Sequence, residues 1–157
     1  MEINAKGDYH MPGPTAYIYD PRFLQHEVGN YELTMPNGKD LEPEPYPSQS
    51  RITRRTAELI NGSGITEHLT PDEPRMASIE ELRYYHDNEY IDQVHETAAK
   101  GGGWLDKETS IAAGSWDAAL LAAGSGMRLV DCVMKGDTRN AYGLLRPPGP
   151  YPRAGRR

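Results

Sequence analysis

The 157-residue chain is long enough for one domain with a hydrophobic core, but its 13 prolines and 16 glycines predict that much of the length is loop. A net charge of −6, with no basic cluster before the last residues, excludes a face that neutralises nucleic-acid phosphates. No apolar run approaches the roughly 20 residues of a membrane-spanning helix, and the start of the chain lacks the pattern of a signal peptide, so we expect a soluble cytoplasmic protein. The single cysteine, Cys132, excludes an internal disulfide and is expected to be a buried thiol.

The first part of the chain predicts one strand and one long loop. Residues 1–15 are polar and broken by Pro12 and Pro14, which predicts a flexible N-terminus. The β-favouring run at 16–19 (AYIY) predicts a buried strand. Residues 22–47 have no sustained period and contain four prolines, and they therefore predict a long surface loop, a candidate wall for a binding site.

The first predicted helix covers residues 50–60. Apolar Ile52, Leu59 and Ile60 recur at helical spacing and give it a weak apolar face. Asn61-Gly62 then supplies a stop signal, because both residues tolerate the left-handed conformation that ends many helices.

A second helical region is predicted to begin at Ser78. Ser78 and Glu81 have the spacing of a capping box, in which each side chain binds the backbone amide of the other residue. Apolar positions continue beyond Asp87, which predicts a further helix until the triple glycine at 101–103 ends the pattern.

The longest predicted helix covers about residues 115–135. Gly136 ends it, and residues 140–145 (NAYGLL) predict a buried strand before Arg146-Pro147-Pro148-Gly149. Strand, helices and strand in this order predict an α/β fold with a parallel sheet. The apolar stripe of the long helix recurs at three- and four-residue spacing, at Trp116, Leu120, Ala123, Met127, Val130 and Met134.

Several segments carry a family resemblance when they are read together and in order. They are Ile18-Tyr19-Asp20-Pro21-Arg22-Phe23 with His26 and Gly29-Asn30-Tyr31; Arg54-Arg55 with Ser63-Gly64; His86 with Glu89-Tyr90-Ile91; Gly114-Ser115-Trp116-Asp117 and the helix after it; and Asn140-Ala141-Tyr142 running into Arg146-Pro147-Pro148-Gly149. Over about residues 17–149 the chain resembles the N-terminal part of the histone deacetylase superfamily, in particular its bacterial class II-type histone-deacetylase-like and acetylpolyamine amidohydrolases.

The resemblance implies an incomplete arginase/deacetylase-like α/β fold, with a partial parallel sheet flanked by helices. In similar proteins a Zn²⁺ ion held by two aspartates and one histidine polarises the acetyl carbonyl and activates a water molecule. Paired histidines move the protons and a tyrosine hydroxyl stabilises the oxyanion. The implied substrates are acetylated amines such as acetyl-lysine or acetylpolyamines.

The chain departs from the family pattern directly after Gly149. Similar proteins continue with the two acid/base histidines, whereas this chain has Pro150 and Tyr151. Proline has no titratable group, and a tyrosine, with a pKa of about 10, is a poor base at neutral pH. The family's zinc ligands and oxyanion tyrosine would lie further along, so we expect a truncated amidohydrolase that is inactive alone and binds no metal.

The histidines that remain do not restore a metal site. They lie far apart in the sequence, without ligand spacing and without a cysteine cluster, so hydrogen-bonded or solvated structural roles are expected for them. They are His10, His26, His68, His86 and His95.

The resemblance singles out three candidate site features. Arg55 matches a basic position that lines the inner channel for acetate release, with an ordinary exposed helix arginine as the alternative. Asp106 lies near the position of an acidic rim residue that holds the substrate backbone, with a solvated loop acid as the alternative. The turn Arg146-Pro147-Pro148-Gly149 is expected to lead toward the active site, which is a structural role.

The chain is predicted to divide into a flexible N-terminus (1–15), the N-terminal part of a deacetylase-like domain (16–149) and an aberrant basic tail (150–157). The tail contains three arginines and no acid, which suggests that the reading frame was lost at the histidine pair. A shifted frame downstream that encodes Asp and His ligands would support this hypothesis. A designed truncation and a genuine short paralogue are the alternatives.

Three roles stay open for such a chain. It is an inactive remnant of a deacetylase, one half of a split enzyme completed by a separately encoded C-terminal fragment, or a non-catalytic binding or oligomerisation module. The module would use residues 22–47, which can take part in dimer contacts in similar proteins. Missing strands would leave 140–145 as an unpaired edge and the long helix with an exposed apolar face, which favours the remnant and predicts aggregation.

Overall fold

The computed structural model describes residues 13–31, 39, 41–106 and 109–148. A three-stranded parallel sheet, in the order β4-β1-β7, forms its centre. The strands are β4 (Leu69–Pro71), β1 (Thr15–Ile18) and β7 (Asn140–Gly143).

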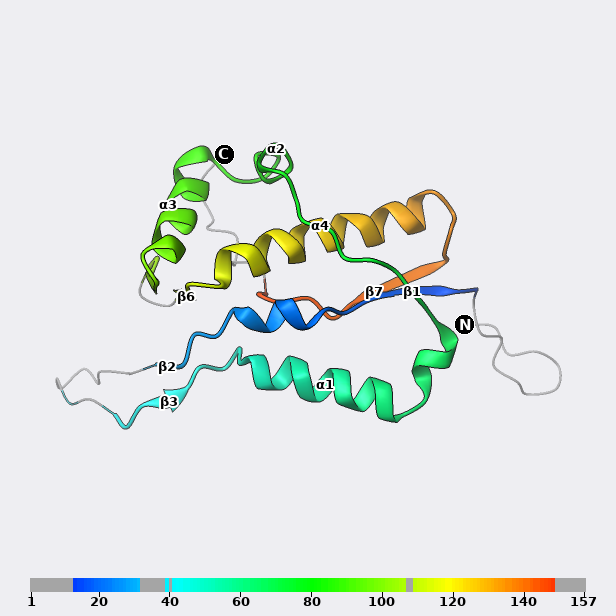
Figure 1. Ribbon diagram of the computed structural model, residues 1–157, viewed down its shortest axis with the longest axis horizontal. Helices are drawn as coiled ribbons and strands as arrows, with labels where there is room; N and C mark the ends of the chain where they lie inside the picture. Colours follow the sequence, from blue (N-terminus) through cyan, green and yellow to red (C-terminus); the bar gives the residue numbers. More distant parts are fainter. Residues whose placement is uncertain (1–12, 32–38, 40, 107–108, 149–157) are drawn as a thin grey trace.

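Two helices lie on opposite sides of this sheet (Figure 1). The long helix α4 (Ser115–Met134) covers one side, and α1 (Ser50–Gly62) lies along the other. Both helices run back from the carboxyl ends of the strands, as the crossover connections of a parallel sheet require. The predicted α/β class, with a partial parallel sheet flanked by helices, is therefore confirmed.

Shorter elements complete the chain. β2 and β3 pair antiparallel, and together with residues 29 and 41–46 they form a projection that we call the arm (Figure 1). β5 and β6 form an antiparallel hairpin. The shorter elements are η1 (Pro21–Gln25), β2 (Asn30–Tyr31), β3 (Glu44–Pro45), η2 (Ile65–His68), α2 (Ile79–Leu82), α3 (Asn88–Ala99), β5 (Gly102–Trp104) and β6 (Ser110–Ala112).

The hydrophobic core lies between β1 and α4. Alternate side chains of β1 point toward α4, because successive residues of a strand face opposite sides of the sheet. Cys132 is buried in this core, as predicted. The buried cluster consists of Ala16, Ile18, Phe23, Leu121, Leu129 and Cys132.

The apolar stripe of α4 is partly exposed, in agreement with the exposed apolar face predicted for the long helix. Val130 is exposed, and Met134 is 80% exposed. The helix turns a face rich in small residues inward, since small side chains allow other segments to approach it closely. On α1 likewise, Ile52 and Leu59 face solvent and Ala57 faces inward. The buried residues of α4 are Ser115, Ala118, Leu121, Gly124, Ser125, Leu129 and Cys132.

The predictions for residues 22–47 and 140–145 need correction. The region 22–47 is not entirely a surface loop, because η1 enters it and fully buries Phe23. Asp20 starts η1 by accepting a hydrogen bond from the Arg22 amide at 2.8 Å. The strand predicted at 140–145 is shorter and not buried, because β7 lies at the edge of the sheet within the described residues and its first three residues are exposed.

Capping residues mark the ends of α2, α3 and α4. Ser78 Oγ accepts from the Glu81 amide at 3.2 Å while Glu81 Oε2 accepts from the Ser78 amide at 2.8 Å, which confirms the capping box. Asp87 caps α3 by accepting from the Tyr90 amide at 2.8 Å. Gly136, with a φ of 79°, follows the end of α4 as expected.

A segment between β4 and α2, residues 72–77, crosses α4, and we call it the strap (Figure 1). At its start, Asp72 accepts hydrogen bonds from Arg128 Nε and from Cys132 Sγ, both at 2.9 Å. Hydrogen bonding, first from Arg128 and then from Cys132, lowers the pKa of Asp72 to about 2. At its end, the Ala77 amide donates to the carbonyl of Leu120 on α4 at 2.9 Å.

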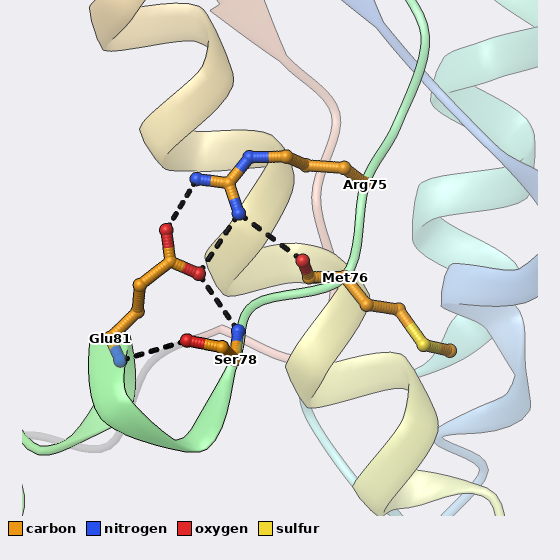
Figure 2. Close-up of polar contacts among 4 residues, drawn as sticks. All are labelled: Arg75, Met76, Ser78 and Glu81. Carbon is orange, nitrogen blue, oxygen red and sulfur yellow. Dashed lines mark hydrogen bonds and ion pairs between the residues drawn. The ribbon is translucent and has the colours of Figure 1, made fainter.

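Figure 2 shows how Arg75 fixes the strap to the start of α2. Its Nη2 donates to Glu81 Oε1 at 2.7 Å and its Nη1 to Glu81 Oε2 at 2.9 Å. The same carboxylate completes the capping box with Ser78. The strap is therefore held by ionised groups at both ends.

Within the described residues, no helix is both long and apolar enough to cross a lipid bilayer. The cytoplasmic location stays a prediction.

Candidate functional site

The carboxyl ends of β1 and β7 lie at one edge of the sheet, because the two strands are parallel. In open parallel sheets, ligands bind outside this edge. The chain continues from β1 through η1 to His26, and from β7 to Arg146. The N-termini of α1 and α4 reach the same edge (Figure 1), so polar side chains from four segments can meet there.

Arg146 lies at the centre of a buried polar cluster at this edge, and it is only 2% exposed. Its Nε and Nη2 donate to the carbonyl oxygen of His26 at 3.1 and 2.7 Å, and its Nη1 donates to Ser48 Oγ at 2.8 Å. Burial lowers the pKa of Arg146, and the nearby Glu27 carboxylate acts in the opposite direction. The guanidinium stays charged, because arginine is not deprotonated in proteins at ordinary pH.

His26 connects this cluster to the start of α4. Its Nδ1 lies 2.7 Å from Ser115 Oγ, which in turn accepts from the Ala112 amide at 2.7 Å. The Ser115 hydroxyl keeps its own proton for a further bond, which suits Nδ1 as the acceptor. Burial, and second the charge of Arg146, lower the pKa of His26 to about 4. The imidazole is therefore neutral near pH 7.

Glu27 ties the start of α1 to the same cluster. The buried Ser50, the first residue of α1, donates from its Oγ to Glu27 Oε2. With the bond from Arg146 to Ser48, two hydrogen bonds hold the entry of this helix. We call the whole set the junction: His26, Glu27, Ser48, Ser50, Ser115 and Arg146.

The junction residues are suited to a structural role. The buried imidazole of His26 is neutral, and the Arg146 nitrogens are engaged in hydrogen bonds. Within the described ranges, no three His, Cys, Asp or Glu side chains are grouped so that they could hold a metal ion. Asp72 and Cys132 already bind each other within the strap contact. The described side chains therefore do not fit the zinc ion that the resemblance implies.

The two predicted substrate contacts lie outside the junction. Arg55 is on the exposed side of α1, 74% exposed at the side chain, and forms an ion pair with Glu58 at 2.8 Å. Asp106 follows β5 in the hairpin, where its Oδ1 accepts from the Thr109 amide at 2.8 Å. A channel role for Arg55 and a rim role for Asp106 stay predictions.

The predicted turn begins inside the junction. Arg146 is buried, Pro147 is half-buried and Pro148 is exposed. Gly149 and the residues that replace the histidine pair, Pro150 and Tyr151, lie outside the described residues. The turn thus leaves the sheet from an anchored arginine.

Sequence reasoning missed the junction as a unit. Arg146 was predicted only as part of a turn, and His26 and Ser115 only as parts of resembling segments. The partners of Arg146, His26 and Ser48, are 120 and 98 residues away in the chain. The one local signal is an arginine that directly follows the apolar pair Leu144-Leu145.

The low pKa of His26 predicts a specific acid sensitivity. Because the folded-state pKa of about 4 is below the ordinary 6.5, the unfolded chain binds more protons at intermediate pH. The free energy of unfolding should therefore fall by about 2 kcal/mol from this residue between pH 7 and 5, and His26→Asn should remove that contribution. Urea unfolding at several pH values measures it, with His68→Asn at an exposed position as the control. An unchanged pH slope in His26→Asn would contradict the prediction.

Comparison with known proteins places this geometry in context. The chain matches the histone deacetylase domain family over residues 46–151. It is 33% identical over 138 residues to a histone deacetylase-like amidohydrolase of Pseudomonas aeruginosa, an alignment that covers 86% of this chain and 36% of that protein. It is 34% identical over 131 residues to the polyamine deacetylase HDAC10 of Homo sapiens, covering 76% of this chain and 19% of that one.

A solved structure shares the fold. The crystal structure of the HDA15 HD domain superposes with a TM-score of 0.74 at 26% identity, over 87% of this chain and 36% of that chain. The chain therefore spans about a third, or less, of the length of the relatives that it matches.

Proposed function

Because this chain belongs to the histone deacetylase family, we propose that it forms the N-terminal part of a deacetylase-type amidohydrolase domain and does not hydrolyse acetylated amines by itself. One observation carries the proposal. The two positions after Arg146-Pro147-Pro148-Gly149, which the resemblance assigns to the acid/base histidines, are Pro150 and Tyr151.

The residues present cannot replace that pair of bases. Proline has nothing to protonate, and a tyrosine with a pKa of about 10 holds its proton at neutral pH. His26, which the junction places near Arg146, is buried, and its Nδ1 is bonded to Ser115. A general base must reach the proton that it abstracts, and a buried imidazole does not.

The role of the chain in this proposal is that of a scaffold. The junction fixes the entries of α1 and α4 and the residue before the proline turn, which is the platform that a site at this edge of the sheet requires. Zinc and its ligands belong to the completed domain. The names of the relatives support an acetylated amine as the substrate class of that domain.

The edge of the sheet supports completion by more polypeptide. Within the described residues, β7 is paired on one side only. Tyr142 on β7 is exposed and stacks on Tyr17 of β1 with ring centroids 6.1 Å apart. Parallel sheets are normally covered at their faces and continue with further strands. A strand added beside β7 would complete the hydrogen-bond ladder and could cover the exposed Tyr142.

Acetate release from an acetyl-lysine peptide and from an acetylated polyamine tests the proposal. The 157-residue chain and its Pro150→His/Tyr151→His variant should each release none. Each protein is then mixed with the remaining two-thirds of the Pseudomonas aeruginosa relative. Both should associate with it, and only the double variant should gain chelator-sensitive activity. Release by the unmodified chain alone, or a failure to associate, would refute the proposal.

A further inference from the structure

The β5–β6 hairpin is held in place by contacts beyond its own two strands. A two-stranded hairpin is at best marginally stable in water, so its position depends on what it packs against. On one side it contacts α3, where a Cβ atom on Gly103 would lie 3.2 Å from Thr97 Cγ2. The end of β6 lies beside the start of α4 (Figure 1), and there Ser115 provides a second attachment.

Ser115 binds the hairpin through its side chain. Its Oγ accepts a hydrogen bond from the backbone amide of Ala112, the last residue of β6, at 2.7 Å. The same oxygen lies 2.7 Å from His26 Nδ1. A hydroxyl has one proton and can accept two hydrogen bonds, so Ser115 can accept from the amide and donate to the imidazole at once. Ser115 is only 2% exposed, so water cannot readily replace either bond.

The residue before Ser115 brings the start of α4 into close contact with the end of η1. Gly114 has no side chain, and a Cβ atom there would lie 2.7 Å from the Gln25 carbonyl oxygen. Because Gln25 directly precedes His26, this backbone contact helps to fix the distance between the Ser115 hydroxyl and the imidazole. The hydrogen bond is therefore supported by the backbone on both sides.

His26 continues the connection to the proline turn. Its carbonyl oxygen accepts from Arg146 Nε and Nη2 at 3.1 and 2.7 Å. The hairpin is thus joined to the turn through Ser115, His26 and Arg146, and these three residues are at most 7% exposed. Buried polar groups of this kind hold their partners firmly, because a group that loses its partner pays the full cost of its desolvation.

We propose that Ser115 is a positioning residue that fixes the β5–β6 hairpin relative to the turn that begins at Arg146. The hairpin carries Asp106, and the turn leads to the positions of the histidine pair, so Ser115 sets the distance between the predicted rim and the acid/base positions of a completed domain. This inference rests on the proposed function for the meaning of those two elements. Amide exchange in the 157-residue chain tests the link without acetate release, so the two proposals can fail separately.

Hydrogen exchange measured by NMR tests this role at single amides of the unmodified chain and its variants. Ser115→Ala removes the acceptor of the Ala112 amide, which should then exchange at least about tenfold faster, as expected for the loss of one hydrogen bond. The Leu105 amide, which donates to the Thr109 carbonyl at 2.9 Å within the hairpin, should exchange faster as well.

The exchange of Arg146 Nε distinguishes a loosened hairpin from general unfolding. Its bond to the His26 carbonyl is left intact in Ser115→Ala, so its exchange rate should change much less than those of the hairpin amides. Ser115→Cys places a thiol of similar size but weaker accepting power at the same position, so its effect on the hairpin should be intermediate. If Ser115→Ala does not fold, Ser115→Cys provides the comparison.

Ser125→Ala is the matched control on the same helix. Ser125 is fully buried, and its Oγ has no hydrogen-bond partner among the described residues. Removing this hydroxyl should therefore leave the exchange of the Ala112 and Leu105 amides unchanged. Unchanged hairpin exchange in the folded Ser115 variants, equal acceleration in Ser125→Ala, or an equal rise at Arg146 Nε would overturn the proposal.

Discussion

Gly124→Ala is expected to lower the free energy of unfolding by about 2 to 3 kcal/mol, although alanine is the better helix former. A Cβ atom at Gly124 would lie 2.2 Å from the Arg75 carbonyl oxygen and 2.5 Å from both the Met76 carbonyl carbon and the Ala77 amide nitrogen. These are backbone atoms of the strap. The strap cannot easily move away, because Asp72 holds its start on α4 and Arg75 holds its end on Glu81.

Gly126→Ala is the matched control, two residues further along the same helix. Its added Cβ would have Leu145 Cδ1 at 3.7 Å as its nearest neighbour, which is an ordinary contact. Without a clash, the gain in helix propensity should stabilise the chain by up to about 1 kcal/mol. Urea unfolding of both variants measures the difference. Equal effects at the two positions would contradict the close contact between the strap and α4.

The elements that the sequence predicts well are those fixed by local chemistry. The capping box needs only Ser78 and Glu81, three positions apart, and it forms as predicted. The cap of α3, in which Asp87 accepts from the Tyr90 amide, is equally local. The order of strands and helices likewise predicts the parallel sheet. By contrast β4, which has no apolar run of its own, was not predicted. It becomes a strand because it pairs with β1, 54 residues earlier in the chain at Thr15 and Leu69.

The faces of the helices were harder to predict, because apolar periodicity does not measure how closely a neighbouring segment approaches. The strap lies against α4 at Gly124, so α4 buries small residues there while Val130 and Met134 face solvent. A stripe of large apolar residues on a helix indicates that something covers it, but not whether the cover lies within the same polypeptide. Leu59 on α1 is likewise exposed.

The candidate site divides in the same way. Family resemblance found the proline turn and the missing histidines, since both are contiguous in sequence. The junction joins residues from four segments, and the one local signal of the buried arginine is the apolar pair Leu144-Leu145 before it. Only the folded backbone brings the carbonyl of His26 to the guanidinium of Arg146. The fold around Arg146 therefore depends on the hydrogen bonds that this buried cation donates.

Arg146→Ala is expected to destabilise the chain by about 3 to 4 kcal/mol. The substitution leaves the His26 carbonyl and Ser48 Oγ without their donor, and it opens a cavity where a fully buried side chain stood. It also removes a cation that interacts electrostatically with Glu27. Arg146→Lys keeps the charge but not the planar set of donors, so its loss should be intermediate. Urea unfolding gives the three free energies.

Arg139→Ala is the control, because Arg139 is exposed and the hydrogen bond from its backbone amide to the Pro14 carbonyl survives the substitution. This substitution should change the free energy of unfolding by no more than about 0.5 kcal/mol. A second measurement follows from the charge of Arg146, which lowers the pKa of His26. Removing the guanidinium should therefore raise that pKa in the folded variant, as NMR titration of the imidazole measures. If Arg146→Ala is as stable as Arg139→Ala and the His26 pKa does not move, the junction does not hold the turn, and the scaffold role assigned to this chain loses its physical basis.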